Sequence, residues 1–166
     1  MREPGNGAWW QGRRGEWYAF LQVLLLALVF VGPRTLAGWP AWPAWLLAPA
    51  RAVGIVLMAA GFVLLVAGGL KLGMPDLTPL PCPRPGGVLR DDGAYGVVRH
   101  PMYCGGIFVS FGWALAVHGW LTLLYATAVL LFAEVKASRE ERWLLATYPD
   151  YAAYRQRVRK LIPFVH

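Results

Sequence analysis

The chain has 166 residues, of which 57% are hydrophobic and 15% are charged, and its formal net charge is +7. An average soluble domain has about 25% charged residues, so this composition argues against a soluble globular protein and against a disordered chain. Nine tryptophans are typical of a membrane–water interface. The basic residues lie between apolar runs, which favours membrane lipids over nucleic acid as their partners. The sequence therefore predicts one membrane domain over 1–166.

Four apolar stretches follow one another along the chain. The first two, 17–31 and about 52–72, approach the roughly 20 residues that a spanning helix needs. A signal peptide is the alternative for the first stretch, but its long core and the lack of an A-x-A site favour a retained helix. The next two, about 103–118 and 121–133, are shorter and closely spaced, which predicts a tight helical hairpin. The expected fold is all-α and polytopic, with about four transmembrane helices that include this hairpin.

The distribution of Lys and Arg predicts how these helices are oriented, because cytoplasmic loops carry the excess of basic residues. With four crossings, one side of the membrane collects 14 of the 16 basic residues, and the other side has only Arg34 and Arg51. Both termini and the second loop are therefore expected in the cytoplasm, and the protein in the cell membrane. The chain then divides into two transmembrane helices over 17–72, a cytoplasmic loop over 73–102, the hairpin over 103–134 and a cytoplasmic tail over 135–166.

The tail is expected to be helical and amphipathic. Its large apolar residues recur at near-helical spacing with arginines between them: Leu144, Tyr151, Tyr154, Val158 and Leu161. Pro149 interrupts this pattern, and Asp150 is a suitable N-cap for a second helix. The pattern is typical of a helix that lies on the membrane surface, and a lid over a site at that surface is the alternative.

Two polar clusters are predicted at the cytoplasmic ends of the hairpin. The first, Arg99–Tyr103, reads Arg-His-Pro-Met-Tyr, and proline suits the first turn of a helix. Free backbone N–H groups at that turn, with an imidazole, a guanidinium and a phenol, can bind an anionic or polar ligand group. The second cluster, 134–142, is charged, and it has Lys136 four residues before Glu140 on one helix face.

The adjacent carboxylates Glu140 and Glu141 point about 100° apart on a helix, so they cannot both face one small ligand equally. We expect one of them to face inward and the other to pair with an arginine or to face water. If the hairpin brings the chain back beside its start, this acidic turn lies near His100 and Tyr103. A carboxylate, an imidazole and a phenol at a membrane surface suit a ligand that carries both a cation and an amine. A solvated helix face is the alternative interpretation.

These pieces, in this order, resemble the superfamily of isoprenylcysteine carboxyl methyltransferases and phospholipid methyltransferases. The resemblance covers about residues 78–163, and the first two helices match only in hydropathy. It rests on these residues: Leu89, Gly93, Tyr95, Arg99–Tyr103, Glu140, Glu141, Leu144, Tyr151, Tyr154, Val158 and Leu161–Pro163.

The resemblance implies that S-adenosylmethionine is the methyl donor and that it binds on the cytoplasmic side, with the loop 73–102 as the cofactor loop. The residues that it implies for cofactor binding are Leu89, Tyr95, His100, Pro101, Met102, Tyr103, Glu140 and Glu141. Catalytic roles fall on Lys136, Arg99 and Glu140. Lys136 stands where the family has a substrate-contacting arginine, so the charge is kept but the bidentate fork is lost.

The predicted function is methyl transfer to a lipophilic acceptor, which is a prenylcysteine-like carboxylate, a lipid amine or a thiol. A related membrane reductase that uses a nicotinamide cofactor is an alternative, although the short chain argues against it. A non-catalytic membrane scaffold is another, and the joint presence of His100, Tyr103 and Glu140 argues against that. No metal site is predicted, because His118 lies at the opposite end of the third apolar stretch from His100.

Overall fold

The computed structural model describes residues 16–73 and 89–162, and these residues form helices with a single isolated β-bridge. The all-α prediction is confirmed for this part of the chain. Predictions for 1–15, 74–88 and 163–166, which include much of the cofactor loop and Pro163, lie outside the described residues. The helices are α1 (Glu16–Val31), α2 (Ala44–Leu72), α3 (Ala94–Val97), α4 (Pro101–Ala116), α5 (Trp120–Thr147) and α6 (Tyr151–Arg157).

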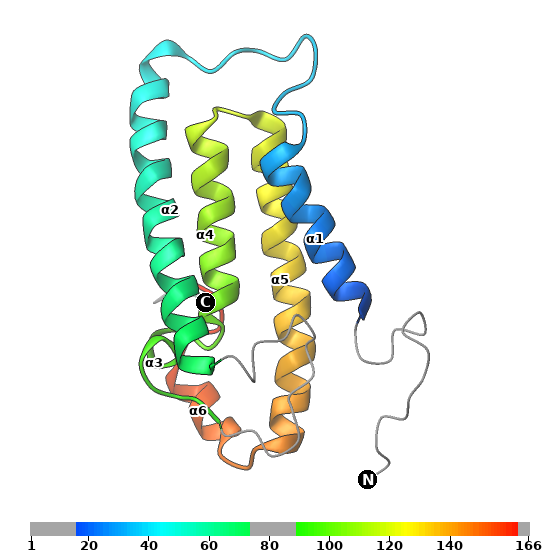
Figure 1. Ribbon diagram of the computed structural model, residues 1–166, viewed down its shortest axis with the longest axis vertical. Helices are drawn as coiled ribbons and strands as arrows, with labels where there is room; N and C mark the ends of the chain where they lie inside the picture. The colour runs from blue at the N-terminus through cyan, green and yellow to red at the C-terminus, as the bar shows by residue number, and fades with distance from the viewer. Residues whose placement is uncertain (1–15, 74–88, 163–166) are drawn as a thin grey trace.

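The long helices run side by side, with α4 between α2 and α5 and with α1 packed across α5 (Figure 1). The short helices α3 and α6 lie together at the end of the bundle where α4 begins and α5 ends. A core cluster joins α1, α4, α5 and the tail, and its buried members are Val29, Ile107, Val129, Ala133, Ala137 and Leu161. This packing places the start of α4 beside the second half of α5.

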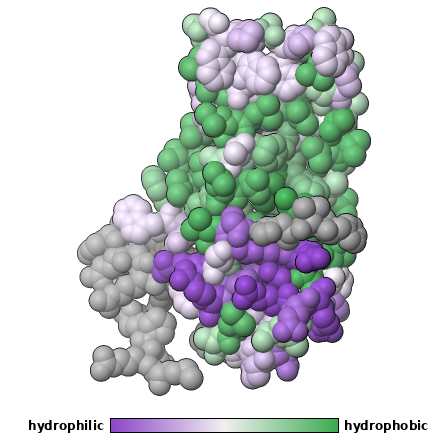
Figure 2. Space-filling model, turned by 180° about the vertical axis from the view of Figure 1, so that it is seen from behind, coloured by the Kyte–Doolittle hydropathy of each residue, from purple (hydrophilic) through white to green (hydrophobic). Residues whose placement is uncertain are grey.

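Two of the helices, α2 and α5, are long and apolar enough to cross a membrane, and α1 and α4 are shorter apolar helices. Large apolar side chains on α2 are exposed, such as Phe62 at 65% and Val63 at 64%. Figure 2 shows an apolar belt that adjoins a band of hydrophilic residues. Such an exposed belt is what lipid contact requires. Crossing by all four helices stays a prediction.

Glycines bring α2 and α4 into direct backbone contact. A Cβ atom added to Gly61 would lie 2.6 Å from the carbonyl oxygen of Gly105, and one added to Gly105 would lie 2.6 Å from that of Gly61. Gly54 and Gly112 face each other in the same way, at 2.5 and 2.6 Å. Small residues at such positions let membrane helices approach closely. The two helices are therefore held together by dispersion contacts along their backbones.

The predicted hairpin is confirmed, but α5 is longer than expected. Only residues 117–119 separate α4 from α5, and His118 adopts a left-handed φ of 52° in this turn. Its Nε2 atom lies 2.8 Å from the carbonyl oxygen of Leu47. Helix α5 then continues to Thr147 rather than ending near Ala133, because residues 134–147 include strong helix formers and contain no Gly or Pro. The second apolar helix likewise begins earlier than predicted, at Ala44.

The tail is interrupted at Pro149, as the pattern predicted, but its second helix is short and packs against the bundle. Helix α6 has seven residues and starts directly after Asp150, which occupies the predicted N-cap position without a side-chain cap hydrogen bond. Tyr151 and Tyr154 are buried, at 1% and 2% exposure, and do not face the membrane surface. After α6 the chain pairs with the segment before α4, where Val98 and Arg159 form a parallel β-bridge. Backbone pairing and tyrosine burial therefore fix the tail against the bundle.

Candidate functional site

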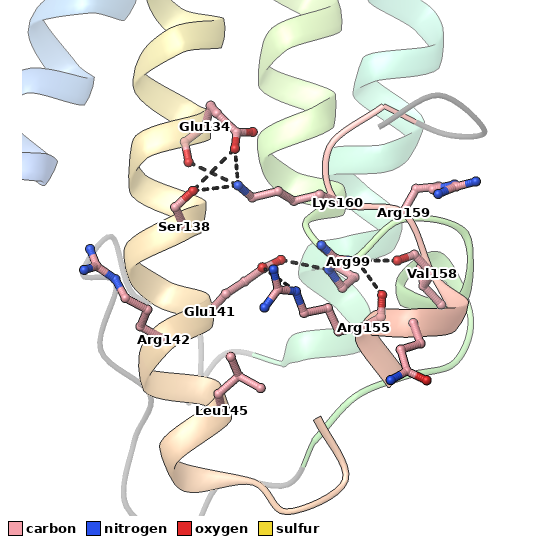
Figure 3. A pocket seen from close by; sticks show the side chains of 11 residues that line it. Arg99, Glu134, Ser138, Glu141, Arg142, Leu145, Arg155, Val158, Arg159 and Lys160 are labelled. Carbon is pink, nitrogen blue, oxygen red and sulfur yellow. Dashed lines mark hydrogen bonds and ion pairs between the residues drawn. The ribbon is translucent and has the colours of Figure 1, made fainter. Parts of the chain in front are cut away.

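The start of α4 and the second half of α5 meet through an ion pair. The Arg99 guanidinium donates from Nε to Oε1 of Glu141 at 2.8 Å, and both side chains are nearly buried, at 9% and 6% exposure (Figure 3). Nε2 of His100 lies 3.3 Å from the same carboxylate oxygen. The hairpin thus brings together residues that stand 42 positions apart in the sequence. The prediction that one of the two adjacent glutamates pairs with an arginine is confirmed for Glu141.

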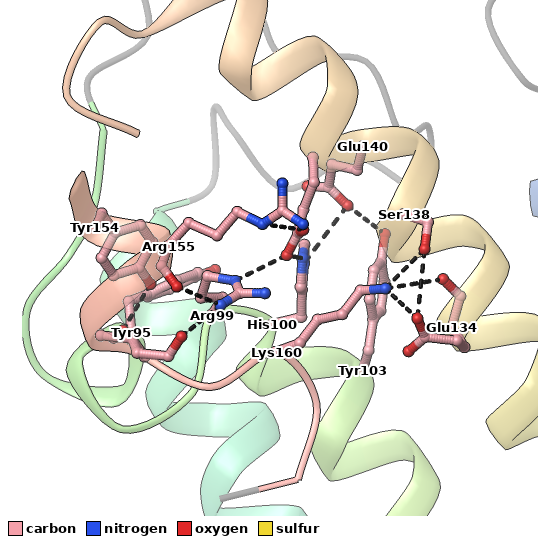
Figure 4. Close-up of polar contacts among 12 residues, drawn as sticks. Tyr95, Arg99, His100, Tyr103, Glu134, Ser138, Glu140, Tyr154, Arg155 and Lys160 are labelled. Carbon is pink, nitrogen blue, oxygen red and sulfur yellow. Dashed lines mark hydrogen bonds and ion pairs between the residues drawn. The ribbon is translucent and has the colours of Figure 1, made fainter. Parts of the chain in front are cut away.

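The other glutamate, Glu140, contacts a neighbouring pair of stacked aromatic rings. The Tyr103 hydroxyl donates to Oε2 of Glu140 at 2.8 Å, and Nδ1 of His100 lies 3.8 Å from that oxygen. The rings of His100 and Tyr103 stack with centroids 5.3 Å apart and an interplanar angle of 11° (Figure 4). Because the Glu140 side chain is 28% exposed while that of Glu141 is 6% exposed, Glu140 is the carboxylate of this pair that a ligand can reach.

Arg99 also holds the C-terminal segment. Its Nη1 atom donates to the carbonyl oxygen of Arg155 at 2.9 Å and to that of Val158. The backbone N–H of Arg99 donates to the carbonyl oxygen of Arg159 at 2.7 Å, and that of His100 donates to Lys160 at 3.2 Å. These contacts tie the tail to the start of α4. They favour a positioning role for Arg99, because its Nε and Nη1 donors already have partners in the protein.

Lys136, which the sequence identified as a catalytic candidate, is buried at 2% exposure. Its Nζ atom donates to Oε1 of Gln22 on α1 at 2.6 Å and lies 5.1 Å from the centroid of the Tyr103 ring. The sequence analysis did not include Gln22, although a lone amide in the apolar stretch 17–31 is a signal of an internal polar contact. This contact brings α1 to the edge of the site.

Two tyrosines of the predicted set connect α3 with α6. The Tyr154 hydroxyl donates to the carbonyl oxygen of Tyr95 at 2.6 Å. Burial, with a smaller contribution from the charge of Glu140, raises the pKa of Tyr95 to about 12. Burial also raises the pKa of Tyr154. Both side chains are therefore neutral phenols at physiological pH, and α6 covers the loop that precedes α4.

The remaining predicted cofactor residues lie around this cluster without a polar contact to it. Pro101 is buried and Met102 is half-buried, and both side chains lie beside Gly68 of α2, with the nearest atoms 3.0 and 3.1 Å from a Cβ placed there. Leu89 is half-buried at the edge of the described residues. Within the described ranges 16–73 and 89–162, no group of three or more metal-ligating side chains comes together.

A second polar cluster, which the sequence analysis did not identify, lies on the other side of Glu141. The ammonium of Lys160 contacts the carboxylate of Glu134 and donates to Oγ of Ser138 at 2.7 Å. A cavity of about 440 Å³ opens here between α5 and the tail (Figure 3). Its α5 wall consists of Glu134, Ser138, Glu141, Arg142 and Leu145. Only the folded tail creates this cavity, so the spacing along the chain gave no sign of it.

Apolar helices and a charged cluster at one end of the bundle define a helical membrane protein with a polar site at the interface. A model of the family described as phospholipid methyltransferase matches residues 49–151, which is more than half of the chain. The chain therefore belongs to this family of membrane methyltransferases. The match includes all of α4 and α5, and thus both halves of the cluster.

One relative is methanethiol S-methyltransferase 1 from Bradyrhizobium diazoefficiens, which is 39% identical over 71 residues. The aligned part covers 42% of this chain and 24% of the relative. The chain thus spans about a quarter of the length of the curated relative that it matches.

Proposed function

We propose that the protein is an integral membrane enzyme that moves the methyl group of S-adenosylmethionine to a lipophilic acceptor at the cytoplasmic face of the cell membrane. The proposal rests on the convergence of Arg99–Tyr103 with Glu140 and Glu141, inside the region that matches the family. In this proposal one membrane domain crosses the bilayer with α1, α2, α4 and α5. The distribution of basic residues supports cytoplasmic termini and a cytoplasmic site.

The cluster has the chemistry that S-adenosylmethionine requires. The partly exposed carboxylate of Glu140 suits an ammonium group, and the stacked rings of His100 and Tyr103 offer faces to a sulfonium cation. When bound, the cofactor supplies a methyl group, whose carbon forms a bond with the acceptor's lone pair while the electron pair of the C–S bond stays on sulfur. The proposed contacts are Leu89, Tyr95, His100, Pro101, Met102, Tyr103, Glu140 and Glu141.

The chain's own residues orient the reactants and exclude water. We assign acceptor contact to Lys136, because its buried ammonium lies beside Tyr103 at the edge of the apolar region and attracts a carboxylate or a thiolate. These two acceptors need no base. An amine or a hydroxyl needs one, and Glu140 is the exposed carboxylate that can take the proton. Arg99 acts as a positioning residue that holds Glu141 and the tail in place.

Three acceptor classes are consistent with this site. The family description names a phospholipid, which favours a lipid amine. The relative from Bradyrhizobium is named for methanethiol, which favours a thiol. A prenylcysteine-like carboxylate is the third class, and it suits the charge of Lys136. If the protein is instead a membrane reductase or a non-catalytic scaffold, none of these three acceptors becomes methylated.

The test is transfer of tritiated methyl from S-adenosylmethionine by the purified protein in nanodiscs. The acceptors are phosphatidylethanolamine, an alkanethiol and a farnesylated cysteine analogue. We expect labelling of one class, and if that acceptor is anionic, Lys136→Met raises its KM by about tenfold or more, because a charge-assisted contact is lost. The matched control is Arg139→Gln, since Arg139 lies on α5 over the rings of Tyr18 and Trp143. No labelling of any acceptor by folded protein would contradict the proposal.

A further inference from the structure

The cavity between α5 and the tail lies next to the proposed methyl-transfer site and shares Arg99 and Glu141 with it as a common wall. Its α5 residues recur along one face of the helix from Glu134 to Leu145, and the ion pair between Arg99 and Glu141 separates it from the aromatic pair of His100 and Tyr103. Its volume of about 440 Å³ lies within the range of about 300–1,000 Å³ that is typical of ligand pockets. It is thus large enough for a lipid headgroup.

The charge of the cavity favours an anion. Five of its lining residues are basic and two are acidic. Figure 3 shows the guanidinium of Arg155 beside Glu141, with Arg142 and Arg159 on the two sides. Within the described part of the chain, neither Arg142 nor Arg159 forms an ion pair. This excess of positive charge repels the sulfonium cofactor, so the cavity and the proposed cofactor cluster select for opposite charges.

The position of the cavity points to the bilayer as the source of the anion. Glu134 directly follows the end of the predicted apolar stretch at Ala133, and it lies at one end of the cavity wall. Figure 2 shows that the hydrophilic band directly adjoins the apolar belt. The polar layer of a leaflet is about 5–8 Å deep beyond the hydrocarbon core. The apolar end of the cavity therefore lies at the depth of lipid phosphates.

We propose that this cavity binds the phosphate of an anionic phospholipid from the surrounding membrane. Arg155 and Lys160 supply donors inside the cavity, and Arg142 and Arg159 add positive charge at its rim, where their guanidinium groups point outward (Figure 3). Guanidinium groups bind phosphate oxygens in a bidentate way, and the acyl chains stay along the apolar helices. Inorganic phosphate offers the same group without chains, so the experiment compares the two sources. This inference is independent of the methyl-transfer reaction.

The test measures binding of dihexanoylphosphatidylglycerol to the full-length protein in detergent by calorimetry, without any cofactor. The variant is Arg155→Gln, and the matched control is Arg157→Gln, because both arginines are exposed on α6 but only Arg155 lines the cavity. We expect Arg155→Gln to raise the dissociation constant about tenfold or more and the control to change it less than twofold. Inorganic phosphate is expected to bind at least tenfold more weakly than the lipid.

If Arg155→Gln and Arg157→Gln lose equal affinity for the lipid, the proposal is overturned, because binding then depends on the general surface charge. Equal binding of inorganic phosphate and lipid would also overturn it in favour of a soluble anion. If Arg155→Gln does not fold, Arg159→Gln serves in its place, since the Arg159 side chain is exposed and only its backbone forms the β-bridge. A loss of lipid affinity in Arg159→Gln, with no loss in Arg157→Gln, supports the proposed site.

Discussion

Arg99 and Glu141 form the contact on which the geometry of the site depends. Their nearly buried side chains join the start of α4 to α5, and the same guanidinium holds two carbonyl groups of the tail. Removing one partner of a buried ion pair is costly because the other charge stays buried and unpaired. This contact therefore fixes where Glu140 and the aromatic rings of His100 and Tyr103 lie.

Two tyrosines of α6 differ in their hydrogen bonding, which leads to a prediction about stability. Both Tyr151 and Tyr154 are buried, but the Tyr154 hydroxyl donates to Tyr95, while that of Tyr151 has no hydrogen-bond partner in the described part of the chain. We expect Tyr154→Phe to lower the free energy of unfolding by about 1–3 kcal/mol, because it leaves the partly buried carbonyl of Tyr95 without its hydrogen bond. Tyr151→Phe is expected to be neutral or stabilising. Thermal unfolding in detergent measures both, and equal losses would contradict this account.

The pKa of Tyr95 leads to a prediction about alkaline stability. Burial raises this pKa from 10 to about 12, so above pH 10 the unfolded chain loses the proton before the folded protein does. The contribution of Tyr95 is therefore complete below pH 10 and is lost as the pH rises through 12. We expect the melting temperature of wild type to fall more steeply above pH 10 than that of Tyr95→Phe. If the melting temperatures of the two proteins fall in parallel above pH 10, Tyr95 is not the cause of the alkaline loss of stability.

At the scale of elements, the close approach of α2 and α4 leads to the sharpest stability prediction. Gly61→Ala places a Cβ atom 2.6 Å from a backbone carbonyl of α4, so the two helices must separate, at a cost of about 1–3 kcal/mol. Gly106 lies on α4 with nothing within 4 Å of an added Cβ. Gly106→Ala is therefore expected to be neutral or slightly stabilising. Thermal unfolding distinguishes the two, and a stable Gly61→Ala would argue against the packing.

The long α5 explains why the site lies at one end of the bundle. Its first part is apolar and its second part carries Lys136, Glu140 and Glu141. Because it continues beyond the apolar part without a break, these side chains are held on a rigid helix that faces the start of α4. A site on rigid elements keeps the positions of its polar groups more precisely than a site on loops.

At the scale of the whole molecule, the sequence was sufficient for the helical class, the hairpin and the meeting of Arg99–Tyr103 with the two glutamates. These features depend on apolar runs and on one short connection, which are local properties. The break at Pro149 and a helix after it were predicted, but the pairing of the tail with Val98 was not, because it joins segments far apart in the sequence. The contact of Gln22 with Lys136 and the basic cavity between α5 and the tail were missed for the same reason, since packing of distant elements creates them.

The most direct test of the central claim is calorimetric binding of S-adenosylmethionine to the purified full-length protein. Wild type is expected to bind it, and Glu140→Gln is expected to bind at least about tenfold more weakly, because an ammonium group loses its carboxylate partner. Glu134→Gln is the matched control, since Glu134 is also a carboxylate on α5 but pairs with Lys160, and its affinity should stay within twofold of wild type. Failure of folded wild type to bind, or equal binding by Glu140→Gln, would contradict the proposed cofactor site.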